Sequence, residues 1–562
     1  MFMKKRILNL LSVLALLLLV VNCAKRSSPT GGPKDEDPPV FVNANPPNYT
    51  TNFEEDEIRV YFDEYIKFKD LQKQLIISPP INPKPLITPL GSASKYISIT
   101  VEDTALVPNT TYVFNFGRSV VDNNEGNPYP YFKYVMSTGD YIDSLKVRGE
   151  IRDALLALPD EYVTVMLYEV DSTYKDSVVY KDQPRYVTNT LDSTTTFELT
   201  NLKAGKYRLV ALKDEDENYT FQPDKDKIGF VDDFITLPRD TAKFQTLTLF
   251  NEILLTQVER PRQPKAQRVN FAYAGVADSI DINLLSPRPE GFESLITYRK
   301  DEDTLKYWYK PKIETDSLVF NVVTPTQNDT LVLRKRPVRN DSLIFSPETR
   351  NAIALGSNFR VKTNIPITGV DTTKITIAKL DSTYVNDFKV VLVPRESRFS
   401  IDFDTEENQT YTITALPEAF TDFLGHKNDT LRFAPRTAQF SDFGDFEITL
   451  AAARDSTAYI VQLTTDKGEV KLELAGEPGQ TVFTFNTVGP AQYLIRVIED
   501  ANGNGKFDTG NFLKGLQPEK VFYYPEIEDI RKGWFPKKIF TLSPSAEAPL
   551  IEEQTNPDLP EN

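Results

Sequence analysis

Cysteine and histidine are almost absent from this chain of 562 residues, which contains one of each, Cys23 and His426. A single cysteine forms no disulfide within the chain, so each domain has to be stable on its hydrophobic core alone. A zinc site of the Cys/His kind needs more ligands than these two. A Ser/His/Asp or Cys/His nucleophile system would have to use His426, and the surrounding stretch FLGHKND has no nucleophile-elbow pattern. These absences argue against an enzyme, and no cofactor is required.

Excess basic charge and long apolar runs are lacking as well. The chain carries 80 acidic and 64 basic residues, which gives a formal net charge of -16. Because nucleic acid is a polyanion, we expect no nucleic-acid partner. After residue 22 no apolar run approaches the roughly 20 residues that a membrane-spanning helix needs. We therefore expect a soluble body of several domains.

The N-terminus holds the one long apolar run. Basic residues at positions 4–6 precede the apolar residues 7–21, and Cys23 follows at once. This order resembles a bacterial lipoprotein signal, in which the peptide is cut before the cysteine and the cysteine receives the lipid. The resemblance implies a signal peptide over residues 1–22 and lipidation of Cys23. The alternative is an unprocessed N-terminal anchor with an incidental cysteine.

Both ends of the predicted mature chain have a composition that forms no core. Residues 23–39, which include the stretch AKRSSPTGGPKDEDPP, are small, polar and rich in Pro and Gly, so we expect a lipidated flexible tether. Residues 543–562 are acidic and rich in Pro, so we expect a disordered tail.

The first domain is expected over residues 40–140. Apolar residues alternate with polar ones at 58–62, 96–101 and 112–116, and Pro, Asn and Gly bound these runs, which is typical of strands in an antiparallel sandwich. The stretches EIRVYFDEYI and ALVPNTTYVFNFGRSVVDNNEGN resemble the bacterial Ig-like domain of the SbsA type, in which a loop of the form L-x-P-N-T-x-Y precedes a late strand. The resemblance implies a non-catalytic Ig-like domain.

The following region has another character. The stretch TTFELTNLKAGKYRLVALKDEDEN predicts a strand, a turn and a second strand that ends in an acidic loop. It resembles the transthyretin-like, carboxypeptidase-regulatory type of β-sandwich, which implies a structural or binding module over residues 145–245. Strand-like runs predict an intervening β-sandwich over residues 246–340.

The pattern then repeats. The stretches NFRVKTNIPITGV and ENQTYTITALPEAFTDFLGHKNDTLRF echo the first domain, and residues 497–507 align without a gap with residues 211–221. We interpret this as a duplication, with a second Ig-like domain over 341–437 and a second transthyretin-like sandwich over 442–542. Convergence of two unrelated β domains is the alternative. The fold class expected is all-β, with tandem antiparallel β-sandwiches (Ig-like and transthyretin-like) on a lipid-anchored flexible tether.

One loop has the spacing of a calcium site. Asp500, Asn502, Asn504 and Asp508 place oxygen at the first, third, fifth and ninth positions, and glycine occupies the sixth. The twelfth position is Asn511 and not the bidentate Glu, so a calcium site here would be weak. Two interpretations stay open: a structural calcium loop, or an Asx- and Gly-rich turn stabilised by its own side chains.

A tripeptide of Asp, Ser or Thr, and then an apolar residue or Thr recurs far more often than the composition predicts. It resembles the acceptor motif for general O-glycosylation of exported proteins in Bacteroidota. The alternative is that the Asp closes a turn before the next strand, and both interpretations can hold at once. The candidate acceptors are Thr104, Ser144, Ser172, Ser177, Ser193, Thr241, Ser279, Thr304, Ser317, Thr330, Ser342, Thr372, Ser382, Thr430 and Ser456.

The whole chain resembles the Ig-like-domain lipoproteins of Bacteroidota. This implies a non-catalytic scaffold that is lipid-anchored at the outer membrane and faces the cell surface, with an outer-membrane barrel protein or other lipoproteins as partners in the assembly or secretion of outer-membrane proteins. One alternative is a surface glycan-binding lipoprotein that uses aromatic groups such as residues 307–309 or 129–132. The other alternative is a carboxylate-based hydrolase.

Overall fold

The computed structural model describes residues 35–190, 195–299, 302–348, 352–353 and 357–542. Cys23, the predicted signal peptide, residues 23–34 of the predicted tether, Ser193 and the predicted tail lie outside these residues. The chain divides into two compact units, Met1–Asp143 and Ser144–Asn562. In the described part of the chain, no helix is long and apolar enough to cross a membrane.

The first unit is a β-sandwich, called sandwich I here (residues 41–137). Its strands form because apolar residues alternate along them, so that Ile58, Val60 and Phe62 of β2 all face one core. A single helical turn, α2 (Leu71–Gln74), precedes β3. One sheet contains β1 (Phe41–Asn45), β2 (Glu57–Phe68), β5 (Ser94–Thr100), β4 (Leu86–Thr88) and β7 (Val120–Asp122), and the other contains β3 (Ile76–Ser78), β6 (Thr111–Asn115) and β8 (Lys133–Ser137).

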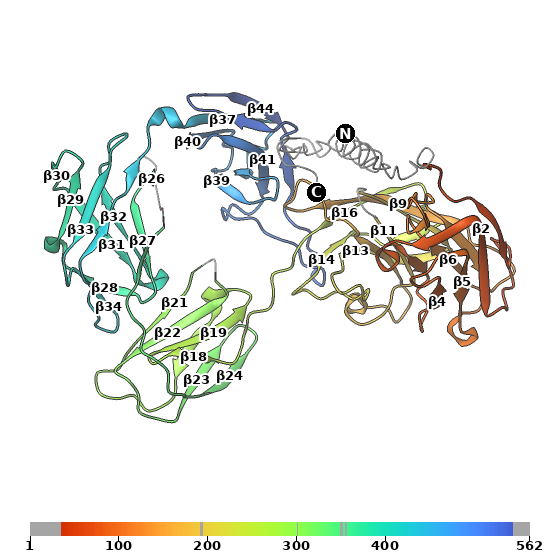
Figure 1. The fold of residues 1–562 in the computed structure, drawn as a ribbon, viewed down its shortest axis with the longest axis horizontal. Coiled ribbons are helices and arrows are strands. Elements are labelled where there is room, and N and C mark those ends of the chain that lie inside the picture. Colours follow the sequence, from red (N-terminus) through yellow and green to blue (C-terminus); the bar gives the residue numbers. More distant parts are fainter. Residues whose placement is uncertain (1–34, 191–194, 300–301, 349–351, 354–356, 543–562) are drawn as a thin grey trace, which may run out of the picture. The chain divides into compact units, whose positions relative to one another are not determined.

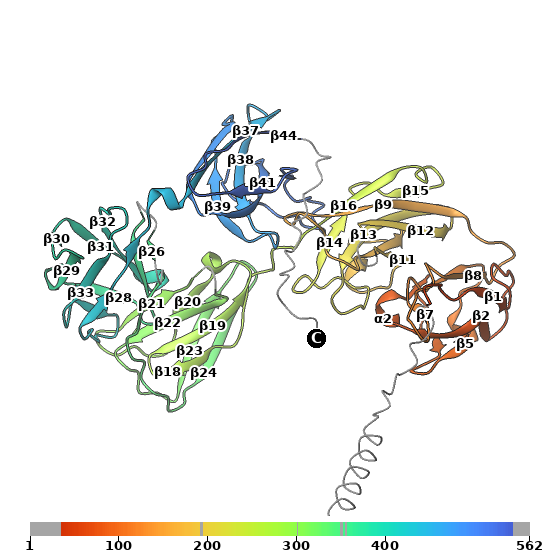
Figure 2. The same ribbon diagram turned by 45° about the horizontal axis from the view of Figure 1, so that its top comes forward.

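The second unit begins with sandwich II (residues 145–249). Its core lies between two sheets, and Figure 2 shows β9 and β16 side by side in the smaller one. The larger sheet contains β11 (Tyr186–Asn189), β10 (Thr164–Glu169), β13 (Gly205–Lys213), β14 (Lys227–Phe230) and β15 (Ile235–Leu237). The smaller sheet contains β12 (Thr196–Leu202), β9 (Leu145–Asp153) and β16 (Phe244–Leu249).

Sandwich III (residues 257–334) and sandwich IV (residues 345–437) follow, each around its own core (Figure 1). Sandwich III contains β17 (Gln257–Val258), β18 (Arg262–Lys265), β19 (Arg268–Ala274), β22 (Thr304–Lys310) and β21 (Glu293–Thr297) against β20 (Asp281–Leu284), β23 (Ser317–Val323) and β24 (Asn328–Arg334). In sandwich IV, β25 (Phe345–Pro347), β27 (Phe359–Thr363), β32 (Arg398–Phe403) and β31 (Phe388–Val393) form one sheet, and β30 (Tyr384–Val385), β29 (Ile375–Lys379), β33 (Tyr411–Ala415) and β35 (Leu431–Phe433) form the other. Two short pairs complete it: β26 (Ala352–Ile353) with β36 (Arg436–Thr437), and β28 (Ile367–Val370) with β34 (Phe420–Asp422).

Sandwich V (residues 444–541) repeats the strand order of sandwich II. Its smaller sheet contains β40 (Val482–Val488), β37 (Gly444–Ala451) and β44 (Lys537–Thr541), and its larger sheet contains β39 (Val470–Ala475), β38 (Ala458–Thr464), β41 (Ala491–Asp500), β42 (Val521–Tyr523) and β43 (Glu528–Ile530). In both sandwiches the last strand pairs in parallel with the first. In both, a buried tyrosine, Tyr207 or Tyr493, donates its hydroxyl to the carbonyl four residues earlier.

Sandwiches I and IV share a set of side-chain hydrogen bonds at corresponding positions. The hydroxyl of Tyr112 accepts from the N–H five residues earlier at 2.8 Å, and Tyr411 does the same at 2.7 Å. Thr138 Oγ1 accepts from the N–H of Thr110 at 3.0 Å, and Thr437 Oγ1 accepts from that of Gln409 at 2.9 Å. The second set lies 299 positions after the first, so one offset relates the two networks.

The prediction of an all-β chain of tandem antiparallel sandwiches is confirmed. It needs one refinement, because β9 with β16, β37 with β44 and β26 with β36 pair in parallel. Short 3-10 turns complete the described elements: Asp103–Ala105, Asp176–Tyr180, Ala277–Ser279, Thr372–Lys374, Pro394–Glu396 and Phe440–Asp442.

Candidate functional site: a groove beside strand β16

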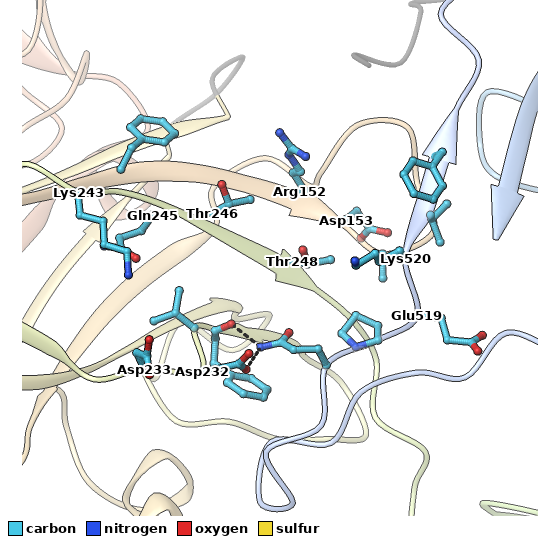
Figure 3. A pocket seen from close by; sticks show the side chains of 18 residues that line it. Arg152, Asp153, Asp232, Asp233, Lys243, Gln245, Thr246, Thr248, Glu519 and Lys520 are labelled. Carbon is cyan, nitrogen blue, oxygen red and sulfur yellow. Dashed lines mark hydrogen bonds between the residues drawn. The ribbon is translucent and has the colours of Figure 1, made fainter. Parts of the chain in front are cut away.

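A groove of about 650 Å³ lies along β16 of sandwich II (Figure 3). Strand β16 and the end of β9 form one wall, and the residues that follow β14 form the other. A segment of sandwich V closes one end. The lining residues are 152–154, 230–233, 243–246, 248 and 517–522.

The edge of β16 is open toward this groove. One side of β16 pairs with β9 from Phe244 opposite Arg148 onward. On the other side, Phe250 exchanges two hydrogen bonds of 2.9 Å with Ile228, and β14 then diverges. Backbone groups alternate in direction along a strand, so Thr246 and Thr248 direct N–H and C=O to the same side as Phe250. The carbonyl of Thr248 lies close to Gly229 of β14, which leaves Thr246 as the open position. The groove is therefore bordered by an unextended strand edge.

A buried amide without a partner lies in the same wall. Gln245 is 3% exposed, lines the groove, and its Nε2 has no hydrogen-bond partner. A buried donor left unsatisfied costs about 1–3 kcal/mol. The register assigns Lys538 to the same position in sandwich V, and that lysine is paired with Glu528 at 2.8 Å. The amide of Gln245 in sandwich II is thus without a partner at the position where the ammonium of Lys538 in sandwich V has one.

Gln517 fixes the end of the groove. Its Nε2 donates to the carbonyl of Phe230 at 3.0 Å and to Asp232 Oδ1 at 2.8 Å, which are the two dashed lines of Figure 3. Both acceptors belong to sandwich II, whereas Gln517 belongs to sandwich V. The groove is therefore completed by a joint between the two sandwiches.

Phe512 is the centre of that joint. Its side chain is fully buried, and its ring lies 5.2 Å from that of Phe230 in an edge arrangement. The guanidinium of Arg208, itself buried, lies 5.5 Å from both rings and donates to the carbonyl of Val231 at 2.9 Å. The backbone N–H of Phe512 donates to Glu252 Oε1 at 2.6 Å. Burial raises the pKa of Glu252, although this hydrogen bond opposes the shift.

A second contact supports the other side of the joint. Asp153 Oδ1 accepts from the N–H groups of Leu155 and Leu156 at 2.8 and 2.7 Å, which shapes the turn after β9. The carbonyl of Leu155 then accepts from the hydroxyl of Tyr523 and from the guanidinium of Arg496, both in sandwich V.

Lys227 holds the carboxylate of Asp153 in place. Its ammonium lies 2.7 Å from Asp153 and 2.7 Å from Asp160. Burial alone would lower the pKa of Lys227, but the two carboxylates outweigh it, and the pKa is raised. The charged lysine therefore ties the turn after β9 to the base of β14.

The predicted calcium residues come together in one loop. Asp500 accepts from the backbone N–H groups of Gly503, Asn504 and Gly505 at 2.8, 3.1 and 2.8 Å. The side-chain amides of Asn502 and Asn504 donate to Asp508 Oδ2 at 2.5 and 2.8 Å. Within the described ranges, no group of three or more His, Cys, Asp or Glu side chains is arranged to hold a metal ion. The loop shows the bonds of an Asx- and Gly-rich turn, and calcium binding stays a prediction.

Sequence reasoning missed the acid that closes this loop. Glu519 accepts from the N–H groups of Ala501 and Asp508 at 2.8 and 3.0 Å. In sandwich II, Asp226 accepts from the N–H groups of Glu215 and Gln222 at 3.0 and 2.8 Å. These residues follow Asp214 by one and eight positions, as Ala501 and Asp508 follow Asp500. Burial raises the pKa of both closing acids. The acid is hard to find by alignment because the segment before it is seven residues longer in sandwich V, and that extra length carries Phe512.

Most of the described motif residues are exposed, whereas the hydroxyl oxygen of Thr241 is buried. Three sites sit inside turns closed by the preceding aspartate, because Asp171, Asp371 and Asp381 each accept from the N–H two residues on, at 2.7, 3.1 and 3.0 Å. Hydrogen bonds from the threonine two residues on lower the pKa of all three aspartates. The exposed acceptors are Thr104, Ser144, Ser172, Ser177, Thr330, Ser342, Thr372, Ser382, Thr430 and Ser456, and the half-buried ones are Thr241, Ser279, Thr304 and Ser317.

The aromatic group at 307–309 does not form a sugar platform. Trp308 is fully buried, packs with Ile365 and Phe423 of sandwich IV, and donates from Nε1 to Thr297 Oγ1 at 3.0 Å. Tyr307 and Tyr309 are buried as well. In the other group, residues 129–132, Tyr131 is 53% exposed, whereas Phe132 is part of the core of sandwich I.

His426 has a local structural role. Its Nδ1 lies 2.8 Å from Asp422 Oδ2, and Asp422 Oδ1 accepts from the backbone N–H groups of Leu424 and His426 at 2.9 and 2.8 Å. In sandwich I, Asp122 closes the matching turn with four backbone N–H groups and no histidine. The turn therefore needs the aspartate, and the histidine adds one further bond to it.

Comparisons with known proteins support the Ig-like resemblance for the first domain. Residues 35–138 match the family model of the bacterial Ig-like domain. No curated protein matches the chain.

Solved structures that are similar include a surface layer protein, a biofilm associated protein and a pilin subunit. Domains 1–6 of the surface layer protein SbsC are 10% identical and cover 82% of this chain and 65% of that chain, with a TM-score of 0.13. The BSP domain of a biofilm associated protein is 8% identical and covers 74% of this chain and 99% of that chain (TM-score 0.13). BcpA, the major pilin subunit of Bacillus cereus, is 11% identical and covers 71% and 99% (TM-score 0.13). The chain thus spans less than two thirds of the surface layer structure, and such distant similarities carry no argument about function.

Proposed function

We propose that this protein is a non-catalytic scaffold, lipid-anchored through Cys23 at the outer membrane and facing the cell surface, that binds an extended segment of a partner protein beside β16. The observation that carries the proposal is the open edge of β16, with the unpartnered amide of Gln245 next to it. An extended segment that added to this edge would pair with the backbone groups of Thr246. A carbonyl or carboxylate of the segment would accept from Gln245.

The joint explains why an open edge is kept here. Exposed strand edges promote aggregation, and proteins usually cover or blunt them. Gln517 and the rest of the segment 517–522 shield one end of the groove, which limits access to a single extended segment. The partner we propose is an outer-membrane barrel protein or another lipoprotein, in the assembly or secretion of outer-membrane proteins.

The first experiment is gentle detergent purification of a C-terminally tagged copy from native membranes, followed by mass spectrometry. A stoichiometric barrel protein or fixed set of lipoproteins is the expected result. If the protein emerges alone, the scaffold proposal is wrong.

A second experiment locates the contact. Thr246→Pro removes the N–H that faces the groove and leaves the pairing with β9 intact, so partner recovery should be lost. Thr541→Pro is the matched control, because Thr541 of β44 corresponds by register to Thr248 of β16 and, like Thr246, directs its N–H away from the paired strand. Equal recovery with both variants would mean that the partner does not bind along β16.

The glycan-binding alternative named two aromatic groups. Trp308 of the first group is fully buried, whereas Tyr131 of the second is 53% exposed. For the hydrolase alternative, four acids line the groove, Asp153, Asp232, Asp233 and Glu519, and two of them, Asp153 and Glu519, already accept backbone N–H groups.

We also propose that some of the motif hydroxyls carry O-linked glycans. The support is their exposure, above all at Ser172, Thr372 and Ser382, where the turn directs the central residue toward solvent. An intact mass equal to that of the bare polypeptide plus lipid would remove this proposal.

A further inference from the structure

The connection between β43 and β44 exposes large apolar side chains. It spans residues 531–536 and has the sequence RKGWFP. Trp534 is 54% exposed and Phe535 is 66% exposed, and Ile539 on β44 is 72% exposed. Phe440, in the turn that contacts this connection, is 56% exposed. These four exposed apolar side chains, three on sandwich V and one in the turn before it, are called the Trp534 patch here.

The fold does not require these residues. In sandwich II the same two strands, β15 and β16, are joined by a connection of equal length, residues 238–243, with the sequence PRDTAK. That connection contains no aromatic residue, and Arg239 in it pairs with Asp240 at 3.0 Å. The two copies share strand order and register around it. The Trp534 patch is therefore an addition to the fold and not a consequence of it.

The backbone of the connection is firmly held. The N–H of Gly533 donates to the carbonyl of Phe443 at 2.8 Å, and the carbonyl of Trp534 accepts from Asp445 at 2.9 Å. The N–H of Trp534 closes a turn to Arg531 at 3.1 Å, and Gly533 supplies the positive φ of +67° that this turn needs. The aromatic rings are thus presented on a preformed support, with Arg531 5.5 Å from the ring of Trp534.

Basic residues flank the rings in the sequence, in a chain whose net charge is -16. Arg531, Lys532 and Lys537 keep 65%, 63% and 73% of their side chains exposed. Their ion pairs are of the exposed kind, which is weak and easily exchanged. The partners are Asp529 for Arg531 at 2.7 Å, Asp442 for Lys532 at 2.8 Å, Glu447 for Lys537 at 3.0 Å, and Glu528 and Glu526 for Lys538 at 2.8 and 3.3 Å.

We propose that the Trp534 patch seats sandwich V on a phospholipid bilayer. Trp534 and Phe535 would enter the boundary between headgroups and acyl chains, and Lys532 and Lys537 would extend to the lipid phosphates. Tryptophan with neighbouring lysine is the combination found at bilayer surfaces, whereas lysine is depleted from protein–protein interfaces. This contact is separate from the β16 groove, so either can fail without the other.

The two tryptophans of the chain provide a direct test. Trp308 is fully buried and Trp534 is more than half exposed, so a change of emission on binding reports Trp534. The chain from residue 24 onward, which has no Cys23 to carry lipid, is mixed with vesicles of phosphatidylethanolamine and phosphatidylglycerol. We expect co-sedimentation, a blue shift of the emission, and quenching by lipids brominated in the acyl chain.

Variants decide which side chains act. Replacing Trp534 and Phe535 with alanine should lower the partition coefficient by at least about tenfold, because each ring loses its apolar contact. Leu516→Ala, which removes an exposed apolar side chain elsewhere in sandwich V, should leave partition unchanged. Absence of vesicle binding, or equal binding by the double variant, would overturn the proposal. So would loss of a co-purifying protein in the double variant without any vesicle binding, since the patch would then contact protein.

Discussion

Replacing Phe512 with alanine should separate sandwich V from sandwich II while both stay folded. Phe512 lies outside the core cluster of sandwich V, yet it is fully buried because it packs on Phe230 of sandwich II. Its removal therefore leaves a cavity at the joint and not in either core. The backbone hydrogen bond to Glu252 does not need the ring and is kept.

The expected cost is about 3–5 kcal/mol, the usual range for a buried Phe changed to Ala. This includes an edge contact between rings, worth about 0.5–1.5 kcal/mol, and the contact with the Arg208 guanidinium, worth about 0.5–2 kcal/mol. Since 1.4 kcal/mol is a factor of ten, the open state of the joint should become roughly two to three powers of ten more populated.

Trypsin can measure that population, because Lys514 lies in the docked segment and is exposed. When opening is fast relative to cleavage, the rate of cutting follows the fraction of open molecules. We expect cleavage after Lys514 to accelerate by the same two to three powers of ten, with rates normalised to a synthetic peptide that carries the same change. Far-ultraviolet circular dichroism should show no loss of β structure.

Leu513→Ala is the matched control, since Leu513 is adjacent and 55% exposed, and such surface changes stay within about 0.5 kcal/mol. If Phe512→Ala were cut no faster than Leu513→Ala after normalisation, Phe512 would not hold the joint. The assignment of the groove to two sandwiches would then have to be given up.

Four further predictions concern single residues. Burial raises the pKa of Glu252 above 4.5, so the wild-type protein should lose stability as the pH rises through that raised value. The variant Glu252→Gln should therefore be more stable than the wild type at pH 7 but not at pH 4. A stability difference that stayed constant with pH would contradict this. Asp500→Ala leaves the backbone N–H groups of Gly503 and Gly505 without an acceptor and should cost about 1–3 kcal/mol in urea unfolding. If the loop binds calcium, calcium should raise the melting temperature of the wild type and not of this variant; no change in melting temperature or in protease resistance of residues 442–542 would end the calcium prediction. Trp308→Ala should destabilise the chain by about 3–5 kcal/mol, and a folded variant that has lost only polysaccharide binding would refute the packing role. Ser382→Ala should lower the intact mass by one glycan if that site is modified, and by one oxygen atom if it is not.

The strands were predictable because their signal is local. Residues 58–62, 96–101 and 112–116 alternate apolar and polar side chains, and they lie in β2, at β5 and its end, and in β6. The parallel pairing of β16 with β9 was not predictable, because Phe244 lies 96 residues after its partner Arg148 and nothing local fixes that register.

The candidate site was not predictable for a related reason. Gln245 is one polar residue in a short strand, and only the fold shows that its amide is buried without a partner. Phe512 lies in the stretch TGNFLKG, which has the composition of an exposed loop. Its burial comes from another sandwich, and single-sequence patterns carry no information about such a contact.

The basic and aromatic stretch at 531–538 was overlooked for a different reason, because the negative net charge of the whole chain hides a local basic cluster. A net charge of -16 discourages a search for basic clusters, yet RKGWFPKK contains four basic residues and two exposed aromatic rings. Net charge describes solubility and long-range attraction, whereas a surface contact depends on the few residues that face it.

The repeated sandwich offers a way to separate fold from function that needs no other protein. What II and V share, such as Tyr207 with Tyr493 and the two closing acids, is what this fold needs to form. Where they differ, the difference is not required by the fold. Sandwich II has an unpaired Gln245 where V has a paired lysine, and V has Phe512 and Trp534 where II has a shorter segment and a polar turn. Each of the proposed contacts, with a partner segment, with the other sandwich and with a bilayer, falls on one of these differences. A contact required only for stability would be expected in both copies.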